Sequence, residues 1–313
     1  MSVRNLEYLF RPASIAVIGA SDRAGSVGAT VIRNLAAGGF AGSVYPVNPA
    51  HLHVHGMRAY ADVASLPQTP DLAVIATPPA TVPGLIAALG TRGTRAAVVL
   101  TAGLSALRDA QGRTLVSAMI ENARPHLMRI LGPNTVGLLT PGLGINASFA
   151  HTAALPGNLA FVSQSGGMTT AVLDWAKSRG IGFSHFISLG NSVDVDFGDV
   201  LDYLASDGGT RAILMYVESI TAARKFMSAA RGLARLKPVI VLKAGRHAAA
   251  AHAAALGSLI AGHSVRRSGC RVQCAGDVVG GLRRPDVVCL AKCADGVIVP
   301  VHAEVGARPG DRG

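Results

Sequence analysis

The chain has 313 residues, of which 50% are hydrophobic and 15% are charged, a composition typical of globular proteins and long enough for two domains. Its formal net charge is +11, but the basic residues are scattered and only 4% of residues are aromatic, which argues against a nucleic-acid partner. No apolar run reaches the roughly 18 residues of a membrane span and the first 20 residues lack a signal-peptide layout, so we expect no membrane association and a cytoplasmic location.

Short apolar runs alternate with helix-length segments in the first part of the chain. We expect strands at 14–19, 43–47, 72–76, 96–101 and 128–131, and helices near 27–37, 81–91 and 108–123. The strands are hydrophobic throughout, as in parallel strands that are covered on both faces. This alternation predicts a doubly wound, Rossmann-like α/β sheet.

The segment from Val17 to Gly28 joins the first expected strand to the first expected helix. Its glycines, Gly19, Gly25 and Gly28, would let the backbone approach a phosphate, and the helix N-terminus adds a partial positive charge. The segment therefore predicts a phosphate-binding loop, with an ordinary turn as the alternative.

The second expected strand is followed by the neutral residue Asn48. A dinucleotide fingerprint would have a carboxylate there and a different glycine spacing. A carboxylate would also repel the ribose 3′-phosphate of coenzyme A, so its absence favours coenzyme A over NAD. Arg23 in the loop is either a bidentate phosphate donor or a solvated side chain.

A second α/β series follows a loop rich in Pro and Gly at 141–157, which places the domain boundary near residue 150. We expect strands at 159–162, 183–187, 212–216 and 238–242, and helices near 168–178, 197–205 and 221–233. Ser163, Gln164, Ser165 and Gly166 lie where the first of these strands passes into a helix. Their hydroxyls and free N–H groups suit a phosphate, and N-capping by Ser165 is the alternative.

The pattern fails after residue 265, where the chain has paired arginines and its only cysteines: Cys270, Cys274, Cys289 and Cys293. No further ligand completes a known metal pattern, so no metal site is expected. We therefore divide the chain into a domain at 1–150, an incomplete second domain at 151–265, and an atypical tail at 266–313.

Five motifs, at 9–21, 45–49, 76–79, 101–103 and 131–134, together resemble the CoA-binding domain of the NDP-forming acyl-CoA synthetases, relatives of the succinyl-CoA ligase α subunit. The resemblance covers residues 5 to about 250 and is nearest to the synthetase-like part of long bacterial protein acetyltransferases fused to a GNAT domain. It implies a Rossmann-like CoA-binding domain followed by a flavodoxin-like, succinyl-CoA-ligase-type α/β domain. The cofactor-binding residues that it implies are Gly19, Ser21, Arg23, Gly25, Ser26, Gly28, Val47, Asn48, Thr77, Pro78, Thr101, Gly103, Pro133 and Asn134.

In the second domain, the resemblance implies that the helix start at Ser163–Gly166 faces inorganic phosphate, an acyl phosphate and a phosphohistidine. Glu218 would be the carboxylate that orients the histidine, with an ordinary surface charge as the alternative. The aspartates at 194, 196, 199 and 202 resemble a family motif, and we interpret them as helix-start residues and not as metal ligands.

The chain departs from the family at the phosphorylated histidine. The alignment puts Ala255 at that position, so His252 would have to substitute after a local shift. A frameshift near residue 265 is one hypothesis for the tail. ATP or ADP and Mg²⁺ would bind only through an ATP-grasp domain, which is absent from this chain. We therefore expect a β-type domain or subunit as partner. A homo-oligomer is a further possibility.

Two functions follow from these observations. The first is the α-type portion of an NDP-forming acyl-CoA synthetase, which converts acyl-CoA, phosphate and ADP to acid, CoA and ATP and is incomplete on its own. The second is a catalytically silent module that senses acyl-CoA in a protein acetyltransferase. An NAD-dependent dehydrogenase is a distant third.

Overall fold

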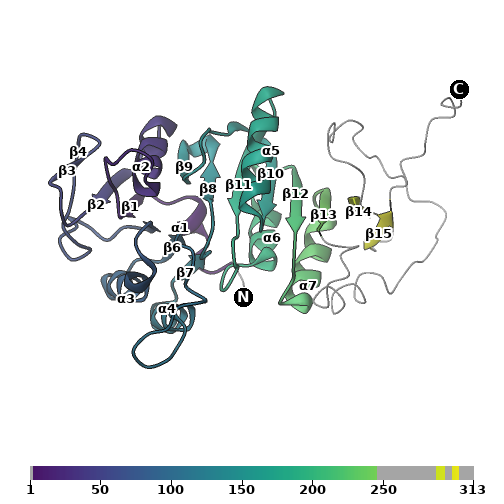
Figure 1. Cartoon of the computed structure of the whole chain (residues 1–313). Helices are drawn as coiled ribbons and strands as arrows, with labels where there is room; N and C mark the ends of the chain where they lie inside the picture. Colours follow the sequence, from purple (N-terminus) through teal and green to yellow (C-terminus); the bar gives the residue numbers. More distant parts are fainter. Residues whose placement is uncertain (1–2, 245–286, 293–297, 303–313) are drawn as a thin grey trace, which may run out of the picture.

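The computed structural model describes residues 3–244, 287–292 and 298–302, which form two sheets side by side (Figure 1). The first sheet has the order β2-β1-β5-β6-β7, and every neighbouring pair in it is parallel. Its strands are β1 (Ser14–Ile18), β2 (Ser43–Val47), β5 (Leu72–Ile75), β6 (Ala96–Val99) and β7 (Arg129–Leu131). A two-stranded hairpin, β3 (His53–Val54) and β4 (Met57–Arg58), follows β2.

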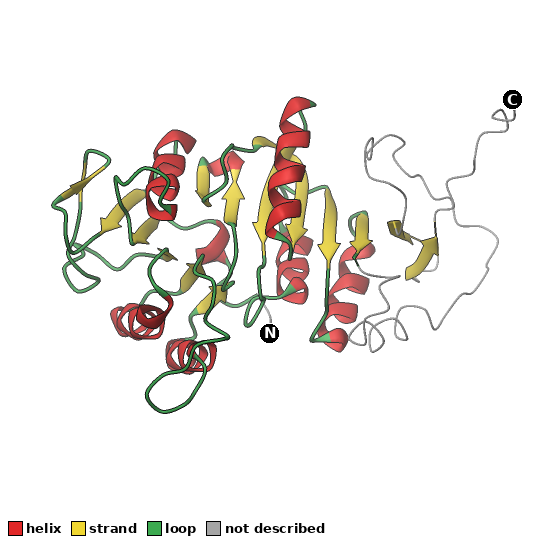
Figure 2. Cartoon of the chain, viewed as in Figure 1, coloured by secondary structure: helices red, strands yellow, loops and turns green. Residues whose placement is uncertain are grey.

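Helices lie on both sides of the first sheet (Figure 2), and alternate side chains of its strands pack into two different cores. Ile15 and Val17 pack into the same core as Val31 of α2, whereas Ala16 packs with Ile86 of α3. Both faces of the strands are thus buried, which explains why these strands are apolar throughout. The helical segments of this half are α1 (Glu7–Phe10), α2 (Val27–Gly38), η1 (Pro79–Thr81), α3 (Val82–Arg92), α4 (Leu115–Ala123) and η2 (Arg124–His126).

The helix predicted at 108–123 begins only at Leu115. Asp109 accepts backbone hydrogen bonds from Gln111 and Arg113, at 3.0 and 2.9 Å, and thereby closes a turn. Thr114 then caps α4 by accepting from the N–H of Ser117 at 3.1 Å. An aspartate that bonds its own backbone competes with helix formation, which is why the helix starts seven residues late.

The second sheet has the order β15-β14-β13-β12-β10-β11-β8-β9. Its centre, β13-β12-β10-β11, is parallel, while both ends are antiparallel. Its strands are β8 (Gly137–Thr140), β9 (Ile145–Ser148), β10 (Leu155–Ser163), β11 (Gly182–Ser188), β12 (Ala212–Val217), β13 (Val239–Lys243), β14 (Val287–Lys292) and β15 (Ile298–His302). Its helical segments are η3 (Pro141–Leu143), α5 (Gly166–Ser178), α6 (Phe197–Ser206) and α7 (Ala223–Ala234).

The two faces of this sheet have separate cores. Phe161 and Phe186 pack beneath Leu173 of α5, whereas Val162 faces the layer that contains Leu201 of α6. The predicted architecture of two successive α/β units, each with helices on both faces of a largely parallel sheet, is therefore confirmed.

The loop predicted at 141–157 contains the whole of β9 and the first residues of β10, so the prediction of a structureless loop was wrong there. The hairpin of β8 and β9 pairs with β11, and the change from one sheet to the other falls between Leu131 and Gly137. The domain boundary near residue 150 remains a prediction, and the sheets change earlier in the chain than that boundary.

Side chains of the two halves contact each other, in addition to the covalent link through the backbone. Phe10 of α1 stacks at 4.6 Å against Tyr203 of α6 and meets the buried ring of His185 edge-on at 5.5 Å. The side chain of Asn34 on α2 donates hydrogen bonds to the carbonyls of Ser148 and Ala150, at 2.9 and 2.8 Å. These contacts fix the first sheet against the second.

Within the described ranges, no helix combines the length and the apolar character needed to cross a membrane.

Candidate functional site

The predicted cofactor-binding residues of the first domain lie at one edge of its sheet. All five strands are parallel, so their carboxyl ends meet at that edge, where open α/β sheets bind ligands. Gly19 follows β1 and donates its N–H to the carbonyl of Val47, the last residue of β2, at 3.0 Å. The hydroxyl of Thr101, after β6, donates to the carbonyl of Thr77, after β5, at 2.8 Å. The structure thus brings together residues that are separated by up to about 80 positions in the sequence.

The glycine loop folds back on itself because Gly28 packs directly on Gly19. A Cβ at Gly28 would lie 1.9 Å from the carbonyl oxygen of Gly19, closer than any real contact. Gly19 itself has φ of +90°, and a Cβ there would lie 2.6 Å from the carbonyl oxygen of Ala76. Both glycines are therefore required by close backbone approach, whereas Gly25 (φ +76°) faces open space.

Polar side chains of the loop are partly used to hold it in place. Ser21 accepts a hydrogen bond from the N–H of Arg23 at 3.0 Å, and Ser26 caps α2 by accepting from Ala29 at 3.2 Å. Asn48 donates to the carbonyl of Ala20 at 2.7 Å. The Arg23 side chain is exposed beside them. Asn48 thus stabilises the loop through this hydrogen bond, a role that its sequence position did not indicate.

The expected pantetheine end of the site lies where the two sheets meet. Asn134 is exposed, has φ of +60° and follows a cis bond between Gly132 and Pro133. Its side chain donates to the Asn191 amide oxygen at 3.3 Å, and the Asn191 N–H donates to the carbonyl of Pro133 at 2.9 Å. A Cβ at Gly190 would lie 2.5 Å from the carbonyl oxygens of Pro133 and Asn134. The loop after β11 therefore packs directly against this end of the first site.

Two further predicted residues, Gly103 (φ +87°) and Pro78, are exposed at the same edge of the first sheet.

Sequence reasoning assigned no binding role to Gly190, Asn191 or Ser192. The available signal was that Gly190 and its neighbours follow a buried strand, the position that ligands prefer in such sheets.

The predicted phosphate-binding residues lie between β10 and α5. Ser163 is buried, and its hydroxyl both donates to the carbonyl of Ser165 (3.0 Å) and accepts from its N–H (3.1 Å). Ser165 accepts from the N–H of Met168 at 3.4 Å, so the predicted N-cap is present. Helix geometry leaves the N–H groups of Gly166 and Gly167 without partners inside α5. These two amides are the donors that the junction offers to an anion.

Glu218, directly after β12, lies next to this junction. Its N–H donates to the side-chain oxygen of Gln164 at 2.8 Å, and its carbonyl accepts from Lys243 Nζ at 2.9 Å. The residue is exposed. The backbone of Glu218 is thus held by hydrogen bonds from both of its polar groups, at the exposed end of β12.

Three of the predicted aspartates, Asp194, Asp196 and Asp199, form ion pairs with the side chains of Arg129 and Lys225. Arg129 of β7 contacts Asp194 at 3.1 Å and the buried Asp199 at 3.0 Å. Lys225 of α7 contacts Asp196 at 3.0 Å and Asp199 at 2.6 Å. Burial raises the pKa of Asp199, while the hydrogen bond from Lys225 and the charge of Arg129 oppose that rise.

Asp196 and Asp199 also form a reciprocal capping box at the start of α6. No cluster of three or more His, Cys, Asp or Glu among the described residues could hold a metal ion. The ion pairs of Asp194 and Asp199 with Arg129 link the start of α6 and the segment before it to β7 of the first sheet.

His252 and Ala255 lie outside the described residues, as do Cys270, Cys274, Cys293 and the point near residue 265 where a frameshift was hypothesised.

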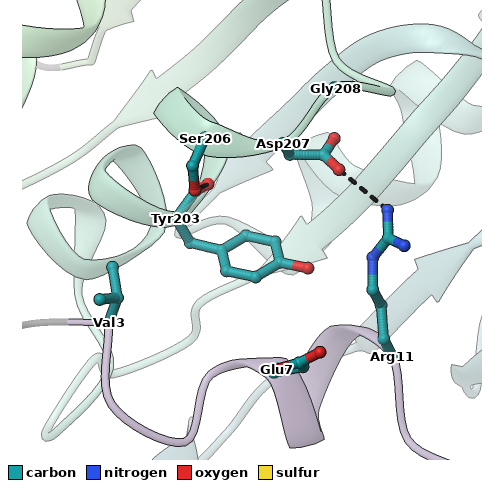
Figure 3. Close-up of a pocket in the computed structure, with 7 residues that line it drawn as sticks. All are labelled: Val3, Glu7, Arg11, Tyr203, Ser206, Asp207 and Gly208. Carbon is teal, nitrogen blue, oxygen red and sulfur yellow. Dashed lines mark hydrogen bonds and ion pairs between the residues drawn. The ribbon is translucent and has the colours of Figure 1, made fainter.

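A cavity of about 450 Å³ lies elsewhere, between α1 and the C-terminal end of α6 (Figure 3). Arg11 reaches across it to Asp207 at 3.1 Å, with Tyr203 beside the pair. Helices run back along their sheet, so the end of α6 lies at the amino-terminal edge of the strands. The cavity is thus at the opposite edge from the predicted sites and belongs to the contact between the two halves.

Comparison with known protein families assigns each half of the chain. Residues 13–141 match the CoA binding domain, and residues 156–273 match the succinyl-CoA ligase like flavodoxin domain. The first match ends within the loop before β9, and the second begins at the second residue of β10.

Two curated relatives and one solved structure describe the level of similarity. The chain is 40% identical over 268 residues to acetate–CoA ligase [ADP-forming] I of Archaeoglobus fulgidus, which covers 85% of this chain and 39% of that protein. It is 38% identical over 255 residues to the α subunit of acetate–CoA ligase [ADP-forming] I of Pyrococcus furiosus, covering 80% and 55%. The dinucleotide-forming acetyl-coenzyme A synthetase 1 of Ca. Korarchaeum cryptofilum, solved in complex with phosphate and ADP, superposes with a TM-score of 0.75 at 38% identity, covering 80% and 54%. The chain spans about half the length, or less, of the relatives that it matches.

Proposed function

The chain is a homologue of the ADP-forming acetate–CoA ligases, and we propose that it is the α-type part of an ADP-forming acyl-CoA synthetase. Its two halves match a CoA binding domain and a succinyl-CoA ligase like flavodoxin domain. The observation that carries the proposal is the convergence of the five strand-end motifs on one edge of the first sheet, next to the second strand–helix junction. The whole enzyme would convert acyl-CoA, phosphate and ADP to the free acid, CoA and ATP.

In the proposed complex, the phosphate groups of CoA face the loop from Gly19 to Gly28. Close packing of Gly28 on Gly19 leaves the backbone of the loop accessible, and the N-terminus of α2 adds its partial positive charge. The exposed Arg23 is placed to pair with a phosphate of the cofactor. The pantetheine arm then passes Thr77 and Thr101 towards Asn134, where the thiol would meet the loop after β11.

At the second junction, inorganic phosphate would bind to the free amides of Gly166 and Gly167. One phosphate oxygen attacks the thioester carbonyl of acyl-CoA, the C–S bond breaks, and CoA leaves as its thiolate or thiol with an acyl phosphate remaining. The contribution of this chain is to hold the two reactants close together and to stabilise the negative charge that builds up between them.

The next step transfers the phosphoryl group from the acyl phosphate to an imidazole and releases the acid. Glu218 is the proposed residue that orients this imidazole so that its free nitrogen faces phosphorus. His252 is the candidate acceptor because Ala255, at the position expected for the histidine, has no nucleophilic atom. We therefore propose that this chain binds CoA and does not complete the reaction by itself.

Transfer of the phosphoryl group to ADP is assigned to a partner. One relative is named as an α subunit, which supports a β-type subunit, and we propose that an ATP-grasp domain in it carries ADP or ATP with Mg²⁺.

The alternative of a silent acyl-CoA sensor from a protein acetyltransferase is not favoured, because the relatives named above are ligases. An association with acetyltransferases has no support among them.

Calorimetric titration of the chain with CoA, acetyl-CoA and NAD tests the first half of the proposal. We expect CoA and acetyl-CoA to bind and NAD not to bind, and NAD binding without CoA binding would contradict it. Incubation with labelled ATP and a β-type subunit of a relative tests the second half. Label on His252 would show that the chain takes part in phosphoryl transfer, and its absence would restrict the chain to binding CoA.

A further inference from the structure

The side chain of Gln164 lies at the centre of three strand ends. Gln164 itself follows β10, its side-chain oxygen accepts from the N–H groups of Glu218 (2.8 Å) and Ser219 (2.9 Å) after β12, and its side-chain nitrogen donates to the hydroxyl of Ser192 after β11 (3.4 Å). An amide oxygen has two lone pairs, and both are used. The oxygen of Gln164 is therefore committed to the segment that carries Glu218.

The cavity that Gln164 shares with the segments after β11 and β12 is too small for an anion. A cavity of about 10 Å³ is lined by Gln164, Ser192 and Ser219, among others, and this volume fits one water molecule at most. The free amides of Gly166 and Gly167 lie at the start of α5, after the N-cap residue Ser165. The side chain of Gln164 is thus packed between the segments that follow β11 and β12.

The contacts of Gln164 also reach the first domain. Ser192, which has φ of +46°, belongs to the same loop as Asn191, and Asn191 is bonded to Asn134 at 3.3 Å. A continuous series of polar contacts therefore runs from the expected thiol end of CoA, through Gln164, to Glu218.

We propose that Gln164 is a positioning residue that holds Glu218 and the loop after β11 in one arrangement, and that it is not itself a ligand of phosphate. This inference rests on the proposed function, since Glu218 is the residue proposed to orient the phosphoryl acceptor. It replaces the sequence-based expectation that Gln164 binds phosphate together with Ser165.

Amide hydrogen exchange of the full chain at Glu218 and Ser219 is the first test. Gln164→Met removes the acceptor at similar volume, and we expect exchange at both amides to accelerate about tenfold, the change that the loss of one ordinary hydrogen bond produces. Gln164→Glu keeps an acceptor oxygen, so it should restore slow exchange. Gln111→Met makes the same chemical change at an exposed turn and should leave both amides as in the parent.

Titration with inorganic phosphate is the second test. If Gln164 acts through Glu218, the Gln164→Met protein binds phosphate with a Kd within about threefold of the parent, less than the loss of a direct charge-assisted hydrogen bond would cause. A larger rise in Kd, or unchanged exchange at Glu218 and Ser219, would overturn the inference. If the parent binds no phosphate, the proposed phosphate site is wrong, and the exchange data still decide whether Gln164 holds Glu218. Circular dichroism of each variant shows that it is folded.

Discussion

Asn34 and Ser148 are 114 residues apart in the sequence, and the side-chain amide of Asn34 donates a 2.9 Å hydrogen bond to the carbonyl of Ser148. The same amide also donates to the carbonyl of Ala150 at 2.8 Å. Because α2 starts at the glycine loop and β9 belongs to the second sheet, one side chain joins the proposed CoA site to the other domain.

Replacing Asn34 by Ala should destabilise the protein by about 1–3 kcal/mol, because two buried carbonyls lose their donor. The free energy of unfolding in urea measures the effect. Arg33→Ala, an exposed change on the same helix, should alter it by no more than about 0.5 kcal/mol. Equal effects of the two substitutions would show that the contact of Asn34 with β9 contributes nothing.

Gly28→Ala should raise the Kd for CoA by about tenfold or more and lower the free energy of unfolding by about 1–3 kcal/mol. The added methyl group would lie 1.9 Å from the carbonyl oxygen of Gly19, so the loop must open. Gly84→Ala in α3 meets no atom within 4 Å and should leave CoA binding unchanged while stabilising the helix slightly. Calorimetry with CoA compares the two variants, and tight CoA binding by Gly28→Ala would place the cofactor elsewhere.

The buried His185 should make stability depend on pH. Burial lowers its pKa from 6.5 to about 4, partly offset by the charge of Asp207. Between these values the unfolded chain binds a proton that the folded chain does not, so stability rises with pH in this window. The contribution is fully present above about pH 6.5 and is lost progressively as the pH falls towards about 4, by at most about 3 kcal/mol.

Urea unfolding at several pH values between 4 and 7 measures this dependence. His185→Phe keeps a ring against Phe10 and removes the titrating group, so its free energy of unfolding should vary less over that range. An identical pH profile for the parent and for His185→Phe would assign the effect to other groups.

Arg129→Met should destabilise the protein by about 3–5 kcal/mol, because it removes one of the two cations that face the buried Asp199. Arg113→Met breaks the exposed pairs with Asp109 and Glu121 and should cost at most about 1 kcal/mol. Chemical unfolding of both variants gives the comparison. A small effect of Arg129→Met would mean that Lys225 alone compensates the charge of Asp199.

Local patterns in the sequence were sufficient for the parallel strands of both sheets, the glycine loop and the two strand–helix junctions. Continuous apolar runs such as Leu72–Ile75 can be identified without knowing their neighbours, because both of their faces are buried. Gly19 and Gly28 could be identified as glycines of a strand–helix junction from their positions in the sequence, although their direct contact with each other could not.

What the sequence did not reveal depends on contacts between distant segments. β9 (Ile145–Ser148) contains two polar residues and lies between turns, so no period marked it as a strand until β8 and α2 were seen to cover it. The roles of Asn34, Asn191 and Gln164 follow from partners far away in the chain, as for Gln164 and Glu218, 54 residues apart. The late start of α4, in contrast, has a local cause, because Asp109 closes a turn just before Thr114. An aspartate at this position is a turn signal that the sequence itself contains.

The hairpin of β8 and β9 belongs to the second sheet, although the match to the CoA binding domain includes β8 and ends at residue 141, before β9. Any chimera that exchanges the CoA-binding half with that of a relative therefore has its natural junction between Leu131 and Gly137, where the chain passes from one sheet to the other. A junction at residue 150 would import a foreign edge hairpin against β11. A junction between Leu131 and Gly137 avoids this, but it places Asn34 and its acceptors Ser148 and Ala150 on opposite sides, so the imported half must carry an asparagine at position 34.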